Sequence, residues 1–340
     1  MRDYLIRRLL LIPPTLLGIM VIVFLVTRFV PGGPLERAMM EFQQLDVGSG
    51  TSTGMAGQDI ALSDEQLERL KEYYGFDKPV LQSFTEWVTK VLRGDLGTSY
   101  RYNEPVWDVI KQRFPISLYY GLVTLVITYL VCIPLGMLKA IKHRSLVDSF
   151  SSILIFIGYA IPGYALGSLL LLYFSVQLEW FPMGGFISFR FDEMSTGEKI
   201  LDVIWHSILP LMCYLVGSFA LVTLLLKNHL LDNLAADYMR TAIAKGVSYH
   251  RSVLTHAMRN SLIPIATTFG QNITLLVSGS FLIETIFDID GFGLLGFNAI
   301  LDRDYPVVMG VVLLGSLLLL IGNILSDILV AIVDPRIRFA

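Results

Sequence analysis

A polar stripe runs through an apolar segment near residue 270. Its members are separated by four, three and four positions, so a helix would place them on one face: Thr267, Gln271, Thr274 and Ser278. Their hydroxyl and amide groups donate and accept hydrogen bonds, and inside a membrane such groups face either another helix or water. Two compatible interpretations therefore stay open, hydrogen bonding between helices and a wall of a translocation path.

Two carboxylates lie close to the ends of apolar runs. Glu284 is near the end of the run that carries the stripe, where a carboxylate is costly unless it is hydrated or paired. A hydrated acid at the membrane interface is the simpler interpretation, and a substrate contact or part of an outer gate is the sharper one. Asp327 is near the end of the last run, and we interpret it as a structural tie to a neighbouring helix or to water.

A polar, net-basic segment over 227–262 separates two apolar runs. Helical spacing joins Leu234, Tyr238, Ala242 and Lys245, and Gly246 is placed to end that helix in a left-handed cap. A second helix is predicted to start at Ser248, with an apolar face made of Val253, Leu254, Ala257 and Met258. Two short helices joined at a glycine would form a knob that fits another protein's groove. The alternative is a loop that only links two membrane helices.

The sequence lacks recognisable catalytic and metal-binding patterns. It has no GxxxxGK[ST] loop to bind phosphate groups, and no HExxH or CxxC pair to bind zinc. His250 and His256 are six positions apart, while Cys132 and Cys213 lie inside apolar runs, where cysteine behaves as a small hydrophobe. We therefore expect no catalytic residue, no metal site and no cofactor in this chain, and its net charge of −3 gives no reason to expect nucleic acid.

The elements that must position these residues are membrane helices. Hydrophobic side chains make up 54% of the 340 residues and charged ones 16%, which is outside the usual composition of soluble proteins. A spanning helix needs about 20 apolar residues, and six runs meet this requirement: 9–29, 116–138, 150–176, 207–226, 263–287 and 307–333. In the third run, Pro162 predicts a kinked helix or, as an alternative, a gating hinge.

The distribution of Lys and Arg orients the six predicted helices. These residues total 13 in the segments 1–8, 139–149, 227–262 and 334–340, against 3 in the short loops 177–206 and 288–306. The positive-inside rule then places both chain termini in the cytoplasm.

The segment 30–115 would be a small external domain. It contains a Gly-rich patch and two predicted amphipathic helices, 62–74 and 80–92. For the loop between the last two runs, the Gly-rich stretch 287–296 predicts a short re-entrant or interfacial turn.

Several motifs resemble those of a known family. TAIAKG with the downstream RNSLIP is similar to the ATPase-contacting loop of bacterial ABC importer permeases, in the version of the peptide and nickel permeases. Arg240 occupies the place of a glutamate found in other importer families, as in the peptide branch. VPGGP, YGFDKPV and RGDLGTSY resemble the region after the first helix in peptide permeases, and the PGGP form resembles the Yej-type branch.

This resemblance implies an all-α polytopic protein with six transmembrane helices of the type I ABC importer permease fold. The implied role is a non-catalytic subunit in the bacterial inner membrane that moves peptides, with ATP and Mg bound by separate ATPase subunits. The implied partners are these ATPases, a homologous second permease and a periplasmic peptide-binding protein. The implied coupling residues are Arg240, Thr241, Ala242, Ala244, Lys245, Gly246 and Val247.

Two other classes of protein are less consistent with the sequence. A stand-alone secondary transporter or channel generally carries internal repeats or several buried ionisable residues, whereas the two halves of this chain show no repeat. An intramembrane protease would need a nucleophile and histidine arrangement, and none is recognisable near Ser218, Ser278 or Ser280.

Overall fold

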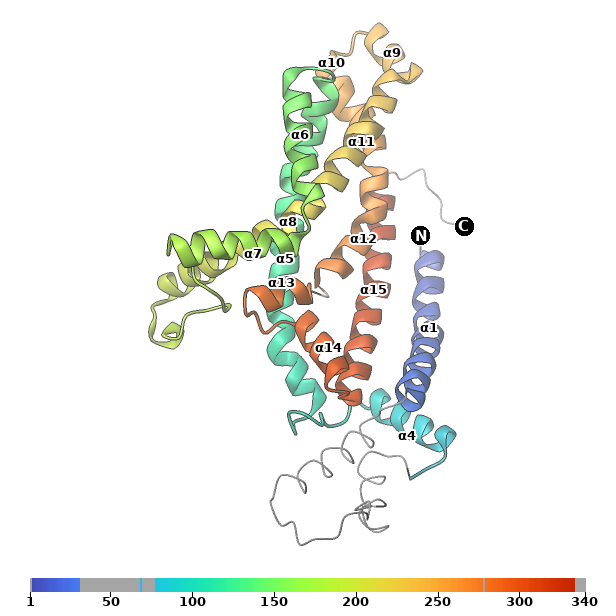
Figure 1. Ribbon diagram of the computed structural model, residues 1–340. Helices are drawn as coiled ribbons and strands as arrows, with labels where there is room; N and C mark the ends of the chain where they lie inside the picture. Colours follow the sequence, from blue (N-terminus) through green and yellow to red (C-terminus); the bar gives the residue numbers. More distant parts are fainter. Residues whose placement is uncertain (1, 31–67, 69–76, 278, 334–340) are drawn as a thin grey trace. The chain divides into compact units, whose positions relative to one another are not determined.

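The computed structural model describes residues 2–30, 68, 77–277 and 279–333, and these residues are mostly helical (Figure 1). Four helices are long and apolar enough to cross a membrane: α1 (Arg2–Phe29), α5 (Val106–Ile141), α8 (Thr196–Ala235) and α15 (Tyr305–Val333). A bent pair of helices gives a fifth candidate span. The predicted helix over 62–74 and the Gly-rich patch lie outside the described residues.

The bent pair occupies the third predicted run. It consists of α6 (Leu146–Ala160) and α7 (Gly163–Leu170), with α7 continued by a wider helical turn over Leu171–Gln177, and the two parts meet at 91°. Ile161 has an extended backbone with ψ 119°, as expected before a proline, and Pro162 then starts the next helix. The predicted kink is confirmed, and the gating hinge stays a prediction.

The fifth predicted run is not one helix, and this corrects the expectation of a single span over 263–287. It divides into α12 (Ile263–Val277, 15 residues) and α13 (Phe281–Ile286, 6 residues). Gly279 interrupts the helical backbone with a φ of +74°. A helix of 15 residues is only about 22 Å long, which is shorter than a hydrocarbon core of about 30 Å.

The segment after α13 also differs from the prediction. Phe287 follows α13 as a turn, but α14 (Phe292–Leu301) already begins within the stretch predicted as a turn. Apolar residues at helical spacing after Gly291 outweigh the glycines, because most of the stretch from 292 is Phe, Leu and Ala.

Helices α5 and α8 extend past the predicted membrane limits. At 1.5 Å per residue, the 40 residues of α8 span about 60 Å. Its start at Thr196 lies in the predicted outer loop, where Ser195 and Glu198 form a capping box. It ends at Ala235 because Ala236 has an extended backbone with ψ 149°.

The chain divides into two compact units. The first comprises Met1–Ile12, Gln112–Leu295 and Gly315–Ala340, and the second comprises Pro13–Lys111 and Gly296–Leu314.

In the second unit, α4 (Val80–Leu92) matches the predicted amphipathic helix. Its Phe84 and Trp87 rings pack on Phe24 of α1 with centroids 5.3 and 5.9 Å apart.

The turn after α4 is held by one buried carboxylate. Asp304 accepts hydrogen bonds from the Ser99 hydroxyl and from the backbone N–H groups of Tyr100 and Arg101. Gly97, at φ +88°, allows the turn to return to the start of α5. The segment RGDLGTSY over 93–100 therefore forms turns between α4 and α5.

Candidate coupling loop and translocation path

The first helix of the 227–262 loop ends where the sequence predicted. α9 (Asp237–Ala244) is followed by Gly246 at φ +88°, with Gly246 N–H donating to Ile243 O at 2.9 Å. Val247 N–H reaches back to Ala242 O at 3.2 Å, so orphan carbonyls of the last turn are satisfied. Leu234 does not belong to this helix, since it lies in the last turn of α8.

The second helix of the loop also begins as predicted, after Ser248. It runs through α10 (Tyr249–Ser252), a wider turn over Val253–Ala257 and α11 (Met258–Ser261). Three of its four predicted apolar residues are buried, but Leu254 is 58% exposed. The structure therefore places Leu254 on the exposed side of this helix, while Val253, Ala257 and Met258 face the core.

A hydrophobic core joins this loop to the membrane helices. Met239, Val253 and Ala257 are at most 1% exposed, and they pack in one cluster with Leu226 and Leu230 of α8. The same cluster includes residues of α5 and α12. The elements α9, α10 and α11 lie beside the end of α8 in Figure 1. The loop is therefore a packed extension of the helix bundle and not a free linker.

The opposite face of the loop is exposed. Of the predicted coupling residues, Ala242 and Val247 are half-buried, and the others are open to solvent: Arg240, Thr241, Ala244, Lys245 and Gly246. Ile243 and Tyr249 are apolar but 45% and 44% exposed. These two residues were not among the predicted coupling residues, although their position inside and just after TAIAKG could have singled them out. An exposed apolar surface with basic flanks suits docking to another protein.

An ion cluster ties three helices together beside this core. Lys227 of α8 donates to both carboxylate oxygens of Asp148 at 2.7 and 2.9 Å. Lys139 of α5 is fully buried and lies 3.1 Å from the same carboxylate, while also donating to Ser151 and Ser152. Lys139 and Lys227 belong to the 13 basic residues counted for the predicted cytoplasmic segments, but both are paired inside the protein, between α5, α6 and α8. The apolar residues around them in the sequence gave no indication of this pairing.

The polar stripe belongs to α12, as far as the structure describes it. Thr267 is exposed, and its hydroxyl donates to Ile263 O at 2.9 Å within the helix. Gln271 and Thr274 follow on the same helix, and Ser278 lies outside the described residues.

The neighbouring faces of α12 are covered. An atom replacing a hydrogen of Gly270 would lie 2.0 Å from Gly322 O of α15, so these backbones are in direct contact. On another face, Asn272 donates to the Tyr129 hydroxyl of α5 at 2.9 Å. Of the stripe residues, Thr267 is the one whose exposure the structure describes, and its side chain is exposed.

Glu284 is fully buried, which makes the prediction of a hydrated interfacial acid wrong. Its Oε1 accepts a hydrogen bond from the Ser117 hydroxyl at 2.9 Å, and its Oε2 accepts one from Leu294 N–H at 2.6 Å. Hydrogen bonds from protein groups therefore take the place of water, the other way to satisfy a carboxylate in an apolar setting.

Asp327 makes the structural tie that was predicted. It accepts a hydrogen bond from the Tyr4 hydroxyl at 2.9 Å and lies 3.3 Å from Arg8 Nε. Both partners are on α1, so the pair joins α1 to α15 inside the first unit.

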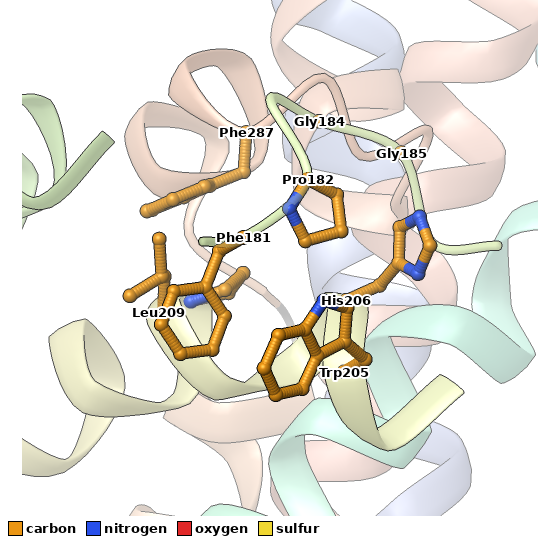
Figure 2. A pocket seen from close by; sticks show the side chains of 9 residues that line it. Phe181, Pro182, Gly184, Gly185, Trp205, His206, Leu209 and Phe287 are labelled. Atoms are coloured by element: carbon orange, nitrogen blue, oxygen red, sulfur yellow. The ribbon is translucent and has the colours of Figure 1, made fainter. Parts of the chain in front are cut away.

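A small cavity near the end of α7 is no site for a peptide. Figure 2 shows it between the loop that carries Pro182 and the part of α8 that carries Trp205 and His206, and the rings of Phe181 and Trp205 stack with centroids 4.5 Å apart. Its volume of about 10 Å³ has room for about one water molecule. In the part of the chain that the structure describes, no three His, Cys, Asp or Glu side chains group as a metal site.

Several helices that are long and apolar enough to cross a membrane are typical of a multi-pass membrane component. Comparison with known proteins is more specific. Residues 132–339 match the family of binding-protein-dependent transport system inner membrane components, and the chain belongs to this family. It is therefore a non-catalytic permease component of an ABC transporter in the inner membrane.

The similarity to individual permeases covers the whole chain. The peptidoglycan transport system permease YejB of Agrobacterium fabrum is 38% identical, over 100% of this chain and 99% of its own. The oligopeptide transport system permease AppB of Bacillus subtilis is 35% identical, over 100% of both chains. The dipeptide transport system permease DppB of Escherichia coli K12 is 32% identical over 99% of both chains. The expected resemblance to peptide permeases, including the Yej type, is confirmed.

Proposed function

We propose that this chain is one of two permease subunits of an importer that moves peptides or peptide-like compounds across the inner membrane. Energy would come from ATP hydrolysis by separate ATPase subunits, which bind the nucleotide and Mg. The observation that carries this proposal is the packing of the 227–262 loop. One face of the loop shares a buried core with α5, α8 and α12, while the opposite face is exposed.

This construction suits a lever. An ATPase that closes on ATP would push on the exposed surface around Arg240, Thr241, Ile243 and Lys245. Because the opposite face is packed to about 1% exposure, the displacement would pass to the helices without being lost in loop motion. Because α11 leads directly into α12, the displacement of the loop would reach the predicted path residues: Thr267, Gln271, Thr274 and Ser278.

A second, homologous permease would complete the path. The exposed side chain of Thr267 on α12 supports this, since it leaves that position open to water or to a helix of a partner subunit. With both termini in the cytoplasm, the segment 30–115 would lie outside, where it meets a periplasmic peptide-binding protein. The six predicted spans remain part of the proposal, with the bent α6–α7 pair as the third and the broken α12–α13 segment as the fifth.

Transport into reconstituted vesicles tests the proposal. The chain would be incorporated with the second permease and the ATPase subunits, and the binding protein would be loaded in turn with peptides of different length. We expect peptide uptake that requires both ATP and the binding protein, and that stops when a catalytic ATPase residue is replaced. Isolation of the chain alone in a form that transports without ATP would contradict it.

A further inference from the structure

The start of α14 is completed by side chains from two other helices. The first N–H groups of a helix have no partners inside it. Here Phe292 N–H donates to Ser117 Oγ at 2.8 Å, and Leu294 N–H donates to Glu284 Oε2 at 2.6 Å. Gly293 N–H also bonds this carboxylate, and the Ser117 hydroxyl donates to Glu284 Oε1 at 2.9 Å. Ser117 on α5 and Glu284 on α13 thus act together as an N-cap for α14.

Two glycines make room for the carboxylate. A Cβ on Gly291 would lie 2.4 Å from the Glu284 carboxyl carbon, and one on Gly279 would lie 2.2 Å from Oε1. Gly279 also has a φ of +74°, which a side chain would strain. Gly291 has no such backbone requirement, so the space taken by the carboxylate is the specific reason for glycine there.

The broken segment between α12 and α14 is supported from further sides. Ser280 N–H donates to the Tyr214 hydroxyl of α8 at 3.2 Å, and Phe287 O accepts a hydrogen bond from Gly185 N–H at 2.8 Å. Arg113 of α5 pairs with Asp290 at 2.7 Å. A hinge would show few such contacts, whereas this segment is held by α5, α8 and the loop before α8.

We propose that Glu284 is a positioning residue whose buried carboxylate caps α14 and locks the break between α12 and α13 as a rigid corner. This inference rests on the proposed function, in which α12 carries the stroke from the coupling loop. Negative charge is favoured at a helix N-terminus, and two acceptor oxygens match the donors that surround them. A rigid corner would make the far end of α12 move together with α5 and α14, so that ATP closure changes the path.

A double-mutant cycle tests the geometry without using transport. Gly291→Ala, Glu284→Ala and the double variant would be compared by thermal unfolding of the assembled importer. We expect Gly291→Ala to lower the melting temperature clearly in the presence of Glu284, and to have no further effect once the carboxylate is removed. Equal effects of Gly291→Ala in both backgrounds would overturn the cap. This outcome is independent of whether the importer carries peptides.

Coupling in vesicles tests the positioning role. Glu284→Gln keeps the size of the side chain but removes its negative charge at the start of α14 and turns one of its two acceptor oxygens into a donor. We expect ATP hydrolysis to continue while peptide uptake per ATP falls about tenfold, with an unchanged KM for the loaded binding protein. Asp288→Asn is the control, since it removes an exposed carboxylate of the same segment and keeps the size of the side chain, and it should retain coupling.

Two results would refute the role. Normal coupling in Glu284→Gln would show that the cap has no part in transmission. A raised KM with an unchanged maximal rate would instead make Glu284 a substrate contact. If the wild-type importer takes up none of the peptides, the proposed function is refuted. The double-mutant cycle measured by thermal unfolding does not depend on that result.

Discussion

Gly246 offers a direct test of the lever, because replacing it changes backbone strain and little else. Its φ is +88°, and a Cβ at this position would meet no atom within 4 Å. A Cβ therefore causes no steric clash with the rest of the described chain. The cost is that of holding an L-residue in a left-handed conformation, about 1–2 kcal/mol for alanine and more for a β-branched residue.

This strain is large enough to change the geometry of the loop. A cost of 1–2 kcal/mol shifts a local equilibrium by a factor of about 5–30, so the population in which the turn between α9 and α10 is open or rotated would rise by about that factor relative to the intact turn. Gly246→Asn is the matched control, because asparagine tolerates this conformation. We expect the order Gly, Asn, Ala, Val from full to least uptake.

The assay is ATP-driven peptide uptake in vesicles, with membrane insertion followed by the amount of protein recovered. We expect Gly246→Val to insert normally and to lose nearly all ATP-dependent uptake. Equal uptake by the Val and Asn variants would refute the argument, because it would show that the angle set by this residue does not transmit the stroke.

Three further predictions concern the contacts around the loop and α12. Asp148→Asn leaves the buried Lys139 without its counter-charge, so we expect a loss of about 3–5 kcal/mol in the free energy of unfolding; a loss below 1 kcal/mol in denaturant titration would contradict the pairing. Ile243→Ala removes exposed apolar surface only, so the thermal stability of the isolated permease should stay unchanged while its affinity for the ATPase falls, as measured by co-purification; unchanged affinity would exclude this face from the docking surface. Gly270→Ala forces a Cβ into the backbone of Gly322, and we expect reduced folding yield in the membrane, whereas a wild-type yield would contradict the close contact of α12 and α15.

Local signals in the sequence were sufficient to predict where the two helices of the 227–262 loop meet. A glycine after a helical pattern and a serine before the next one mark the ends of α9 and α10, since helix caps depend on neighbouring residues. Apolar periodicity likewise gave α4 its bounds at Val80 and Leu92. Leu254 was misplaced, because its apolar character and its spacing do not report that it points away from the core that buries Val253, Ala257 and Met258.

The sequence by itself determined a multi-pass helical protein, the ends of the loop helices and the membership of a permease family, because these depend on composition, short-range spacing and recognisable motifs. Tertiary structure alone decided that the fifth run breaks at Gly279 and that Glu284 is buried instead of hydrated. It also decided that Lys139 is an internal charge. Each of these outcomes depends on partners far away in the chain, such as Ser117 for Glu284, and hydropathy reports the polarity of a residue but not which groups will surround it.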